Sequence, residues 1–225
     1  MEGTGVTAAA LVYRESKPER DAPEAIVIAF HPEGEDGRDT DARLSGLKAH
    51  CQVVVPKAWR ALNPRMYGPD ENQHFAWFFV YGPAQPEPAT FGDSLFQLEQ
   101  FVHDVRERVP AGVPILLIGW DQGAALAVTL AGVIPEFIDG VLAFDGYLPE
   151  ISGWTLPSDD LGGLPVTLVH RKDSIVPPAL RAATAEALQA RCASVTAGNA
   201  DDGITIEDWV RGCARLGKRT FAEVS

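Results

Sequence analysis

The sequence predicts an α/β protein with a mostly parallel central sheet and helices on both faces. Short apolar runs, partly β-branched, alternate along the chain with longer amphipathic or alanine-rich stretches. This order is typical of strands joined by crossover helices. The 225 residues, of which 46% are hydrophobic, are enough to bury one sizeable core. We therefore expect one domain over residues 1–225.

Six segments are predicted to be strands because each is short, apolar and bounded by turn-forming residues. In chain order they are residues 8–13, 25–30, 52–55, 114–118, 140–144 and 165–169. The first two are expected to form an antiparallel pair at one edge of the sheet. The remaining strands are expected to run parallel, because a helical pattern separates most of them.

Four helices are predicted between and after these strands. Residues 93–109 carry apolar side chains at three- and four-residue spacing with charged residues opposite, so one face should pack on the sheet. Residues 122–130 are almost wholly apolar, which indicates a buried helix, and residues 178–190 begin with a proline suited to a first helical turn. The last helix should follow Thr205, with Asp208 supporting the cap.

Two proline-containing segments, residues 57–73 and 81–90, have no clear periodicity and are expected to be loops. We expect them to lie over the carboxyl ends of the strands, because α/β proteins place their sites there.

Composition limits the kinds of molecule that the protein is expected to bind and the cellular compartment in which it is expected to lie. The 19 Lys and Arg residues against 31 Asp and Glu residues give a net charge of −12, which disfavours nucleic acid and anionic membrane surfaces. The three cysteines have no metal-binding or disulfide spacing, and the first residues lack a targeting pattern. We expect a cytoplasmic protein that acts on a small molecule and binds neither nucleic acid nor membrane. A homodimer remains possible.

The segment with the clearest chemical meaning joins a predicted strand to a predicted helix. It reads Gly119-Trp-Asp121-Gln-Gly123, and an apolar run precedes it. This pattern is typical of a nucleophile elbow, in which a strained turn presents one side chain above the sheet and flanking glycines prevent collisions. Asp121 is therefore the leading candidate for a catalytic residue.

The flanking residues extend this pattern to most of the chain, which resembles the phospholipase/carboxylesterase family. The matching segments are His31-Pro-Glu-Gly34, Trp77-Phe78, Asp145-Gly-Tyr-Leu-Pro149 and Asp173-Ser-Ile-Val-Pro177. The resemblance implies an α/β-hydrolase fold, with Asp173 at the position of the triad acid. It also implies that the backbone N–H groups of Glu33 and Gln122 take the place of the oxyanion-hole donors.

Two departures from the family pattern change the expected chemistry. Asp121 stands where the family has its serine nucleophile, and the family's histidine should fall near residues 200–203, where this chain has Asp201 and Asp202. No histidine follows His170. Since the family triad runs nucleophile, acid, histidine, an ordinary serine-esterase mechanism is excluded.

Three functions remain open. Asp121 could serve as a general acid or base in a cyclase, isomerase or lyase, which requires only one titrating group. It could instead attack carbon as a nucleophile, as in the related haloalkane dehalogenases and epoxide hydrolases, although these need a histidine to activate water. The third alternative is an inactive relative that binds a ligand or a partner. We rank proton transfer first.

Several other side chains are candidates for contact with the substrate. They are Gln122, Glu33, His31, His74, Trp77, Trp120 and Asp202. For His31 and His170 a structural role in orienting loops is the simpler interpretation, and for the tryptophans core packing is equally plausible. The carboxylates have no regular metal-ligand spacing, so we predict neither a metal site nor an organic cofactor.

Overall fold

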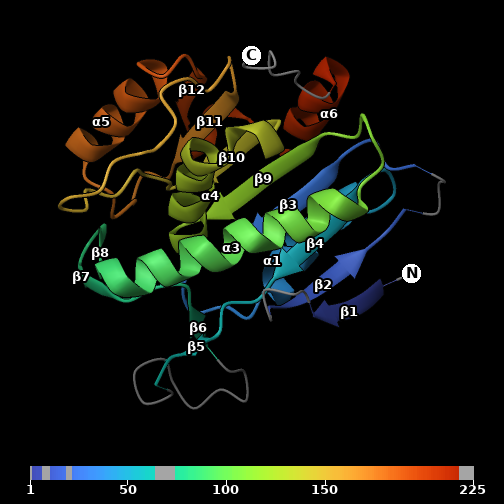
Figure 1. Ribbon diagram of the computed structural model, residues 1–225, viewed down its shortest axis with the longest axis horizontal. Helices are drawn as coiled ribbons and strands as arrows, with labels where there is room; N and C mark the ends of the chain where they lie inside the picture. The colour runs from blue at the N-terminus through green and yellow to red at the C-terminus, as the bar shows by residue number, and fades with distance from the viewer. Residues whose placement is uncertain (1, 7–10, 19–21, 64–73, 218–225) are drawn as a thin grey trace.

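The computed structural model describes residues 2–6, 11–18, 22–63 and 74–217. Its described strands form an eight-stranded sheet in the order β1-β2-β4-β3-β9-β10-β11-β12. The six strands from β4 to β12 in this order run parallel to one another, whereas β1 is antiparallel to β2 and β2 is antiparallel to β4 at one edge. Figure 1 shows this twisted sheet with helices in front of it and behind it. The predicted fold class, a mostly parallel sheet covered by helices, is confirmed.

Five of the parallel strands coincide with predicted segments. They are β3 (Ile26–Phe30), β4 (Gln52–Pro56), β9 (Ile115–Trp120), β10 (Gly140–Phe144) and β11 (Pro165–His170). Every residue of β3 is buried, as expected for an interior strand covered on both faces. The sixth parallel strand, β12 (Ser194–Asn199), was not predicted, because its burial pattern is that of a largely exposed edge strand.

The prediction of an antiparallel pair between residues 8–13 and 25–30 is wrong. The antiparallel pair is formed by β1 (Glu2–Val6) and β2 (Val12–Ser16), and residues 8–10 lie outside the described part of the chain. β2 then pairs with β4, while β3 lies between β4 and β9. The wholly apolar composition of β3 favours this central position, since an edge strand would expose part of it.

Helices cover the two faces of the sheet unequally. On one face, the core includes side chains of α3 (Pro88–Arg108), α4 (Gln122–Val133) and α5 (Pro178–Gln189). On the other face, α6 (Ile206–Leu216) packs on the strands, and Leu44 at the end of α1 (Arg38–Arg43) joins it. The predicted helices are therefore confirmed, with Thr205 capping α6 by accepting a hydrogen bond from Asp208 N at 3.1 Å.

Helix α3 begins five residues before the predicted start, inside the segment expected to be a loop. Pro88 occupies the first turn, where its missing N–H is no loss. The side chain of Glu87 caps the helix by accepting hydrogen bonds from Ala89 N and Thr90 N at 3.2 and 2.8 Å. One of the prolines that indicated a loop, Pro88, therefore marks a helix start.

The connections over the carboxyl ends of the strands contain two small antiparallel ladders. The predicted loop at 57–73 contains β5 (Arg60–Ala61), which pairs with β6 (Phe75–Ala76). Residues 64–73 of this loop lie outside the described part of the chain. β7 (Val80–Gly82) pairs with β8 (Gln85–Pro86) just before α3. Short 3-10 helices occupy Ser45–Leu47, Pro135–Phe137 and Ala200–Asp202. No helix in the described residues is long and apolar enough to span a membrane.

Candidate active site

Asp121 lies on a sharp turn between β9 and α4. Its backbone has φ 51° and ψ −117°, a conformation that is strained for any residue other than glycine. Two backbone hydrogen bonds hold the turn. Asp121 N donates to Phe144 O of β10 at 2.9 Å, and Ala125 N of α4 donates to Asp121 O at 3.0 Å. This is the geometry of the predicted nucleophile elbow.

The glycines on either side of Asp121 are required by close backbone contacts. A Cβ atom on Gly119 would collide with the backbone of Gly123 and Ala124, and one on Gly123 would collide with the backbone of Phe30. The strand, the turn and the helix can therefore approach one another only with glycine at both positions. This packing fixes Asp121 rigidly above the sheet.

Two backbone N–H groups surround the Asp121 carboxylate. Glu33 N donates to its Oδ2 at 3.4 Å, and the N–H of Gln122 also donates to the carboxylate. Burial nevertheless raises the pKa of Asp121 above its ordinary value, and the charge of Asp145 adds to the rise. The N–H groups and Arg171 oppose that rise. Two backbone N–H groups therefore stabilise the ionised form of Asp121. Burial outweighs them, so Asp121 takes up a proton more readily than an exposed aspartate does.

Asp121 opens onto a cavity of about 350 Å³, which we call the Asp121 pocket. Glu33, Gln122 and Asp121 form its polar side. Its other walls come from the β7–β8 hairpin, the segment after β10 and the segment after β11, and they include Val80, Tyr81, Pro83, Ala84, Tyr147 and Ile175. None of the described lining residues is a lysine, arginine or histidine. The described lining therefore combines two acidic side chains with largely apolar walls.

The side chain of Gln122 organises one wall of this pocket. Its Oε1 accepts hydrogen bonds from Trp77 N at 2.9 Å and Phe78 N at 3.3 Å. Its Nε2 donates to Glu33 Oε2 at 2.7 Å and to Phe78 O at 2.9 Å. The amide is therefore fully used within the protein, and Gln122 positions Glu33 and the Trp77–Phe78 backbone.

An ion pair between the buried Asp145 and the exposed Arg171 lies near Asp121. Asp145, which follows β10 and also has positive φ, accepts hydrogen bonds from Arg171 N at 3.0 Å and from Arg171 Nε. His170 Nδ1 is 3.8 Å from Asp145 Oδ1. Although burial acts to raise the pKa of Asp145, its interactions with His170, Ser174 and Arg171 hold it well below its usual value. Asp145 therefore stays ionised and places a negative charge near Asp121.

The candidate histidines His31 and His74, and His170, do not line the Asp121 pocket. His31 is buried, donates from Nδ1 to Pro32 O at 2.7 Å and accepts at Nε2 from Ala58 N at 3.0 Å. Burial lowers the pKa of His31 to about 4, so its ring is neutral. His74 lies with Nδ1 2.6 Å from Gly34 O, and His170 lies behind Asp145.

Trp77 and Trp120 pack inside the protein. Trp77 is fully buried, its Nε1 donates to His31 O at 2.8 Å, and its backbone binds Gln122. Trp120 stacks on Phe144 with ring centroids 5.3 Å apart, on the opposite face of the sheet beside α1 and α6. Neither tryptophan lines the Asp121 pocket.

The structure places the two other acidic candidates away from the pocket lining. Asp173 is exposed on the turn after β11, where its charge acts on Arg171. Asp202 is exposed, and its Oδ2 accepts from Asn199 N at 2.6 Å in a capping box. Within the described residues, no cluster of three histidine, cysteine or acidic side chains could hold a metal ion.

Sequence reasoning missed Tyr147, Asp145, Arg171 and Ile175 as site residues. Tyr147 is buried in the pocket wall, and burial raises the pKa of its phenol, with the charges of Asp121 and Glu33 adding to the effect. The signal for Tyr147 and Asp145 was available in Asp145-Gly-Tyr-Leu-Pro149, which matched the family. Arg171 and Ile175 flank the matched Asp173 segment, and only the fold shows which of these side chains faces the pocket.

The elbow, the sheet order and the loops over the carboxyl strand ends define the chain as an α/β-hydrolase-fold protein. It belongs to the phospholipase/carboxylesterase family, whose model matches residues 13–203. Among curated protein sequences, none matches the chain.

Solved structures of the same fold cover almost the whole chain. A carboxylesterase from Mesorhizobium loti is 16% identical, with a TM-score of 0.71 over 96% of this chain and 98% of that chain. A Bacillus cereus carboxylesterase is 16% identical, with a TM-score of 0.70 over 93% and 94%. Acyl-protein thioesterase 2 from Zea mays is 17% identical, with a TM-score of 0.66 over 91% and 96%. At these identities the likeness establishes the fold alone.

Proposed function

We propose that the protein is an enzyme that transfers protons through Asp121 within a small, neutral and largely apolar substrate, as a cyclase, isomerase or lyase does. One observation carries the proposal: a carboxyl with a raised pKa faces an apolar pocket and is bonded to two backbone N–H groups. Burial favours the protonated form, which can donate to the substrate. The N–H groups of Glu33 and Gln122 then stabilise the carboxylate that remains, which can accept a proton from a neighbouring atom.

The resemblance to the family supports an active site at Asp121, but the residues at that site do not support ester hydrolysis. The backbone N–H groups that would stabilise an oxyanion in a serine esterase are directed here at Asp121 itself. An acyl group would also meet two carboxylates, those of Asp121 and Glu33. Ester hydrolysis therefore loses its nucleophile and its oxyanion site through one substitution.

Two features disfavour Asp121 as a nucleophile. The N–H groups of Glu33 and Gln122 that donate to the Asp121 carboxylate stabilise its charge and so lower its nucleophilicity. None of the described histidines lines the pocket, so hydrolysis of an alkyl ester on Asp121 has no imidazole to activate water.

Deuterium exchange into simple model compounds tests proton transfer by Asp121. Neutral enones, enol ethers and lactones are incubated with the protein in D2O, and incorporation of deuterium is followed by NMR. We expect exchange with the wild type and a loss of about 100-fold or more in Asp121→Asn. Asp159→Asn, which changes an exposed aspartate outside the pocket, serves as the control and should retain the rate.

Three results would overturn the proposal. Equal exchange in the wild type and in Asp121→Asn would remove Asp121 from the reaction. A stable adduct on Asp121 after incubation with epoxides or alkyl halides, detected as added mass on the intact protein, would identify a nucleophile instead. Binding of the probes without any exchange would leave ligand binding as the function.

A further inference from the structure

The Asp121 pocket contains a hydroxyl for which the described part of the chain supplies no partner. Tyr147 lies in the pocket lining, and only 4% of this residue is exposed. No described group forms a hydrogen bond with its phenolic oxygen, and protein atoms do not fully enclose that oxygen. A buried tyrosine hydroxyl normally has a hydrogen-bond partner. This arrangement therefore favours a ligand in the pocket that supplies one.

The backbone holds Tyr147 at the same edge of the sheet as Asp121. Asp121 follows β9 and Tyr147 follows β10, and these two strands are parallel neighbours. Hydrogen bonds fix the segment on both sides of Tyr147. Asp145 N donates to a backbone oxygen of β11 at 2.8 Å, and Leu148 N donates to Thr184 Oγ1 at 3.0 Å. One ligand can therefore contact the phenol and the Asp121 carboxyl at the same time.

The other polar side chains of the described lining are not available as donors of this kind. The amide of Gln122 is fully used within the protein. The carboxylate of Glu33 accepts from Gln122 and has no proton to donate in its ionised form. Tyr81 is 75% exposed, so water solvates its hydroxyl. Tyr147 is thus the neutral donor that a ligand beside Asp121 would meet.

The electrostatics of the pocket keep Tyr147 protonated. Burial raises the pKa of its phenol, and the negative charges of Asp121 and Glu33 raise it further. The phenol is therefore neutral at physiological pH and donates a hydrogen bond instead of acting as a base. A neutral donor in a buried position stabilises negative charge that develops on an oxygen atom of the ligand.

We infer that Tyr147 is a second catalytic residue, which donates a hydrogen bond to a carbonyl oxygen of the substrate while Asp121 transfers a proton at the adjacent carbon. This inference rests on the proposed function, and it narrows the substrate class to small apolar carbonyl compounds such as ketones and lactones. Ionised Asp121 takes a proton from the carbon next to the carbonyl group. The electron pair of that C–H bond moves toward the carbonyl oxygen, where the O–H of Tyr147 stabilises the charge. Asp121 then returns the proton to the same carbon or to one conjugated with it, so the atoms of the substrate are conserved.

The carbonyl carbon of a bound ketone reports this hydrogen bond directly. The probe is benzylideneacetone, a neutral apolar enone, labelled with carbon-13 at its carbonyl. Its resonance moves downfield when the oxygen accepts a hydrogen bond, because electron density leaves the carbon. We expect a downfield shift of the bound probe in the wild type and its loss in Tyr147→Phe, which keeps the ring and removes only the hydroxyl. Tyr147→Phe breaks no described hydrogen bond, so its melting temperature should equal that of the wild type.

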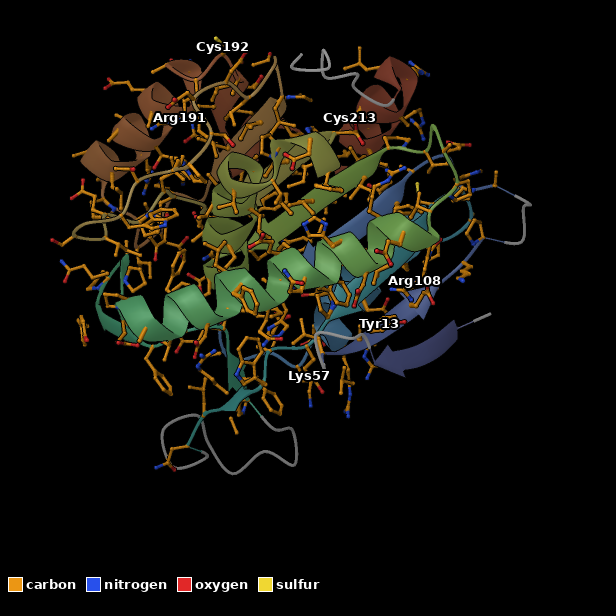
Figure 2. The ribbon with its side chains drawn as sticks, in the orientation of Figure 1. Tyr13, Lys57, Arg108, Arg191, Cys192 and Cys213 are labelled. Atoms are coloured by element: carbon orange, nitrogen blue, oxygen red, sulfur yellow. The ribbon has the colours of Figure 1, made fainter. Side chains whose placement is uncertain are left out.

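Deuterium exchange at the methyl group of the same probe measures the catalytic part. Tyr147→Phe should lower kcat about tenfold or more with a smaller change in KM, because the hydrogen bond strengthens as charge develops on the oxygen. Tyr13→Phe is the matched control and should retain both the shift and the rate. Tyr13 is also buried, its hydroxyl accepts from Arg108 Nη1 at 3.0 Å, and it does not line the pocket. Figure 2 labels Tyr13 beside Arg108, at the end of α3 far from the β7–β8 hairpin.

An unchanged carbon-13 position or an unchanged exchange rate in Tyr147→Phe would overturn the inference, as would a failure of the wild type to bind the ketone. A melting temperature that falls together with the rate would assign Tyr147 a structural role instead. Failure of the proposed function gives a different result, which is exchange that survives in Asp121→Asn. The carbon-13 shift does not require turnover, so its loss in Tyr147→Phe would still identify Tyr147 as the donor in that case.

Discussion

The backbone N–H of Glu33 donates a hydrogen bond to Oδ2 of Asp121 at 3.4 Å, so the protein's own carboxylate occupies the place that an oxyanion takes in a serine esterase. The N–H of Gln122 supports the same carboxylate. A serine hydroxyl at this position would leave both donors to the substrate. With aspartate at this position, both N–H groups stabilise the charge of the Asp121 carboxylate itself, and the proposal of proton transfer in place of ester hydrolysis rests on this arrangement.

The Gln122 side chain should contribute strongly to stability. Gln122→Leu removes the acceptor for Trp77 N and Phe78 N and the donor to Phe78 O, all of which are buried. We expect the free energy of unfolding to fall by roughly 3 kcal/mol or more, because each of the three unpaired buried groups costs about 1 to 3 kcal/mol. Urea unfolding of the variant and the wild type measures this difference in stability. A loss below about 1 kcal/mol would show that the hydrogen bonds of the Gln122 side chain contribute little to stability.

Glycine at position 123 is required by packing, whereas glycine at position 212 is not. Gly123→Ala forces a Cβ into the backbone of Phe30, and we expect it to lower the melting temperature sharply or to prevent folding. Gly212→Ala, inside α6 with open space around it, should instead stabilise the protein by about 0.5 to 1 kcal/mol. Thermal unfolding of both variants compares them, and a tolerated Gly123→Ala would contradict the described elbow.

Acid should destabilise the protein through His31. Its pKa is lowered to about 4 by burial, so the unfolded chain binds a proton there before the folded chain does. Stability from this residue is therefore complete above pH 6.5 and is lost as the pH falls toward 4, by roughly 3 kcal/mol in total.

Urea unfolding between pH 7 and pH 4 measures that loss, with His31→Gln as the comparison. We expect the variant to be less stable at pH 7, because His31 accepts from Ala58 N and donates to Pro32 O, but to lose less stability on acidification. Parallel pH profiles for the two proteins would disprove the assignment to His31.

The sequence predicted the fold class and the elbow, because both depend on local patterns. Continuous apolar runs identify β3 and β9, and two glycines around one polar residue identify the turn at Asp121. Pairing at the sheet edge depends on contacts distant in sequence, so residues 8–13 were matched with the wrong strand. The exposed strand β12 has too weak an alternation of apolar and polar residues to be found.

The candidate site was only partly predictable. Glu33, Gln122 and Asp121 lie together in the lining of one pocket, and the family motifs give their backbone positions. Asp173 matches a motif, yet its side chain is exposed, because the motif fixes the turn and not the direction of the side chain. The influence of Asp145 on Asp121 could not be read from spacing, since it depends on the lateral order of β9, β10 and β11.

The titration of Asp121 tests the central claim most directly. The side-chain carboxyl is followed by NMR in protein labelled with carbon-13 at aspartate, and the signal absent from Asp121→Asn assigns it. We predict a pKa above the ordinary value of about 3.9 and a lower one in Asp145→Asn, which removes a neighbouring negative charge. A carboxyl that titrates at or below the ordinary value in the wild type would contradict Asp121 as a proton donor.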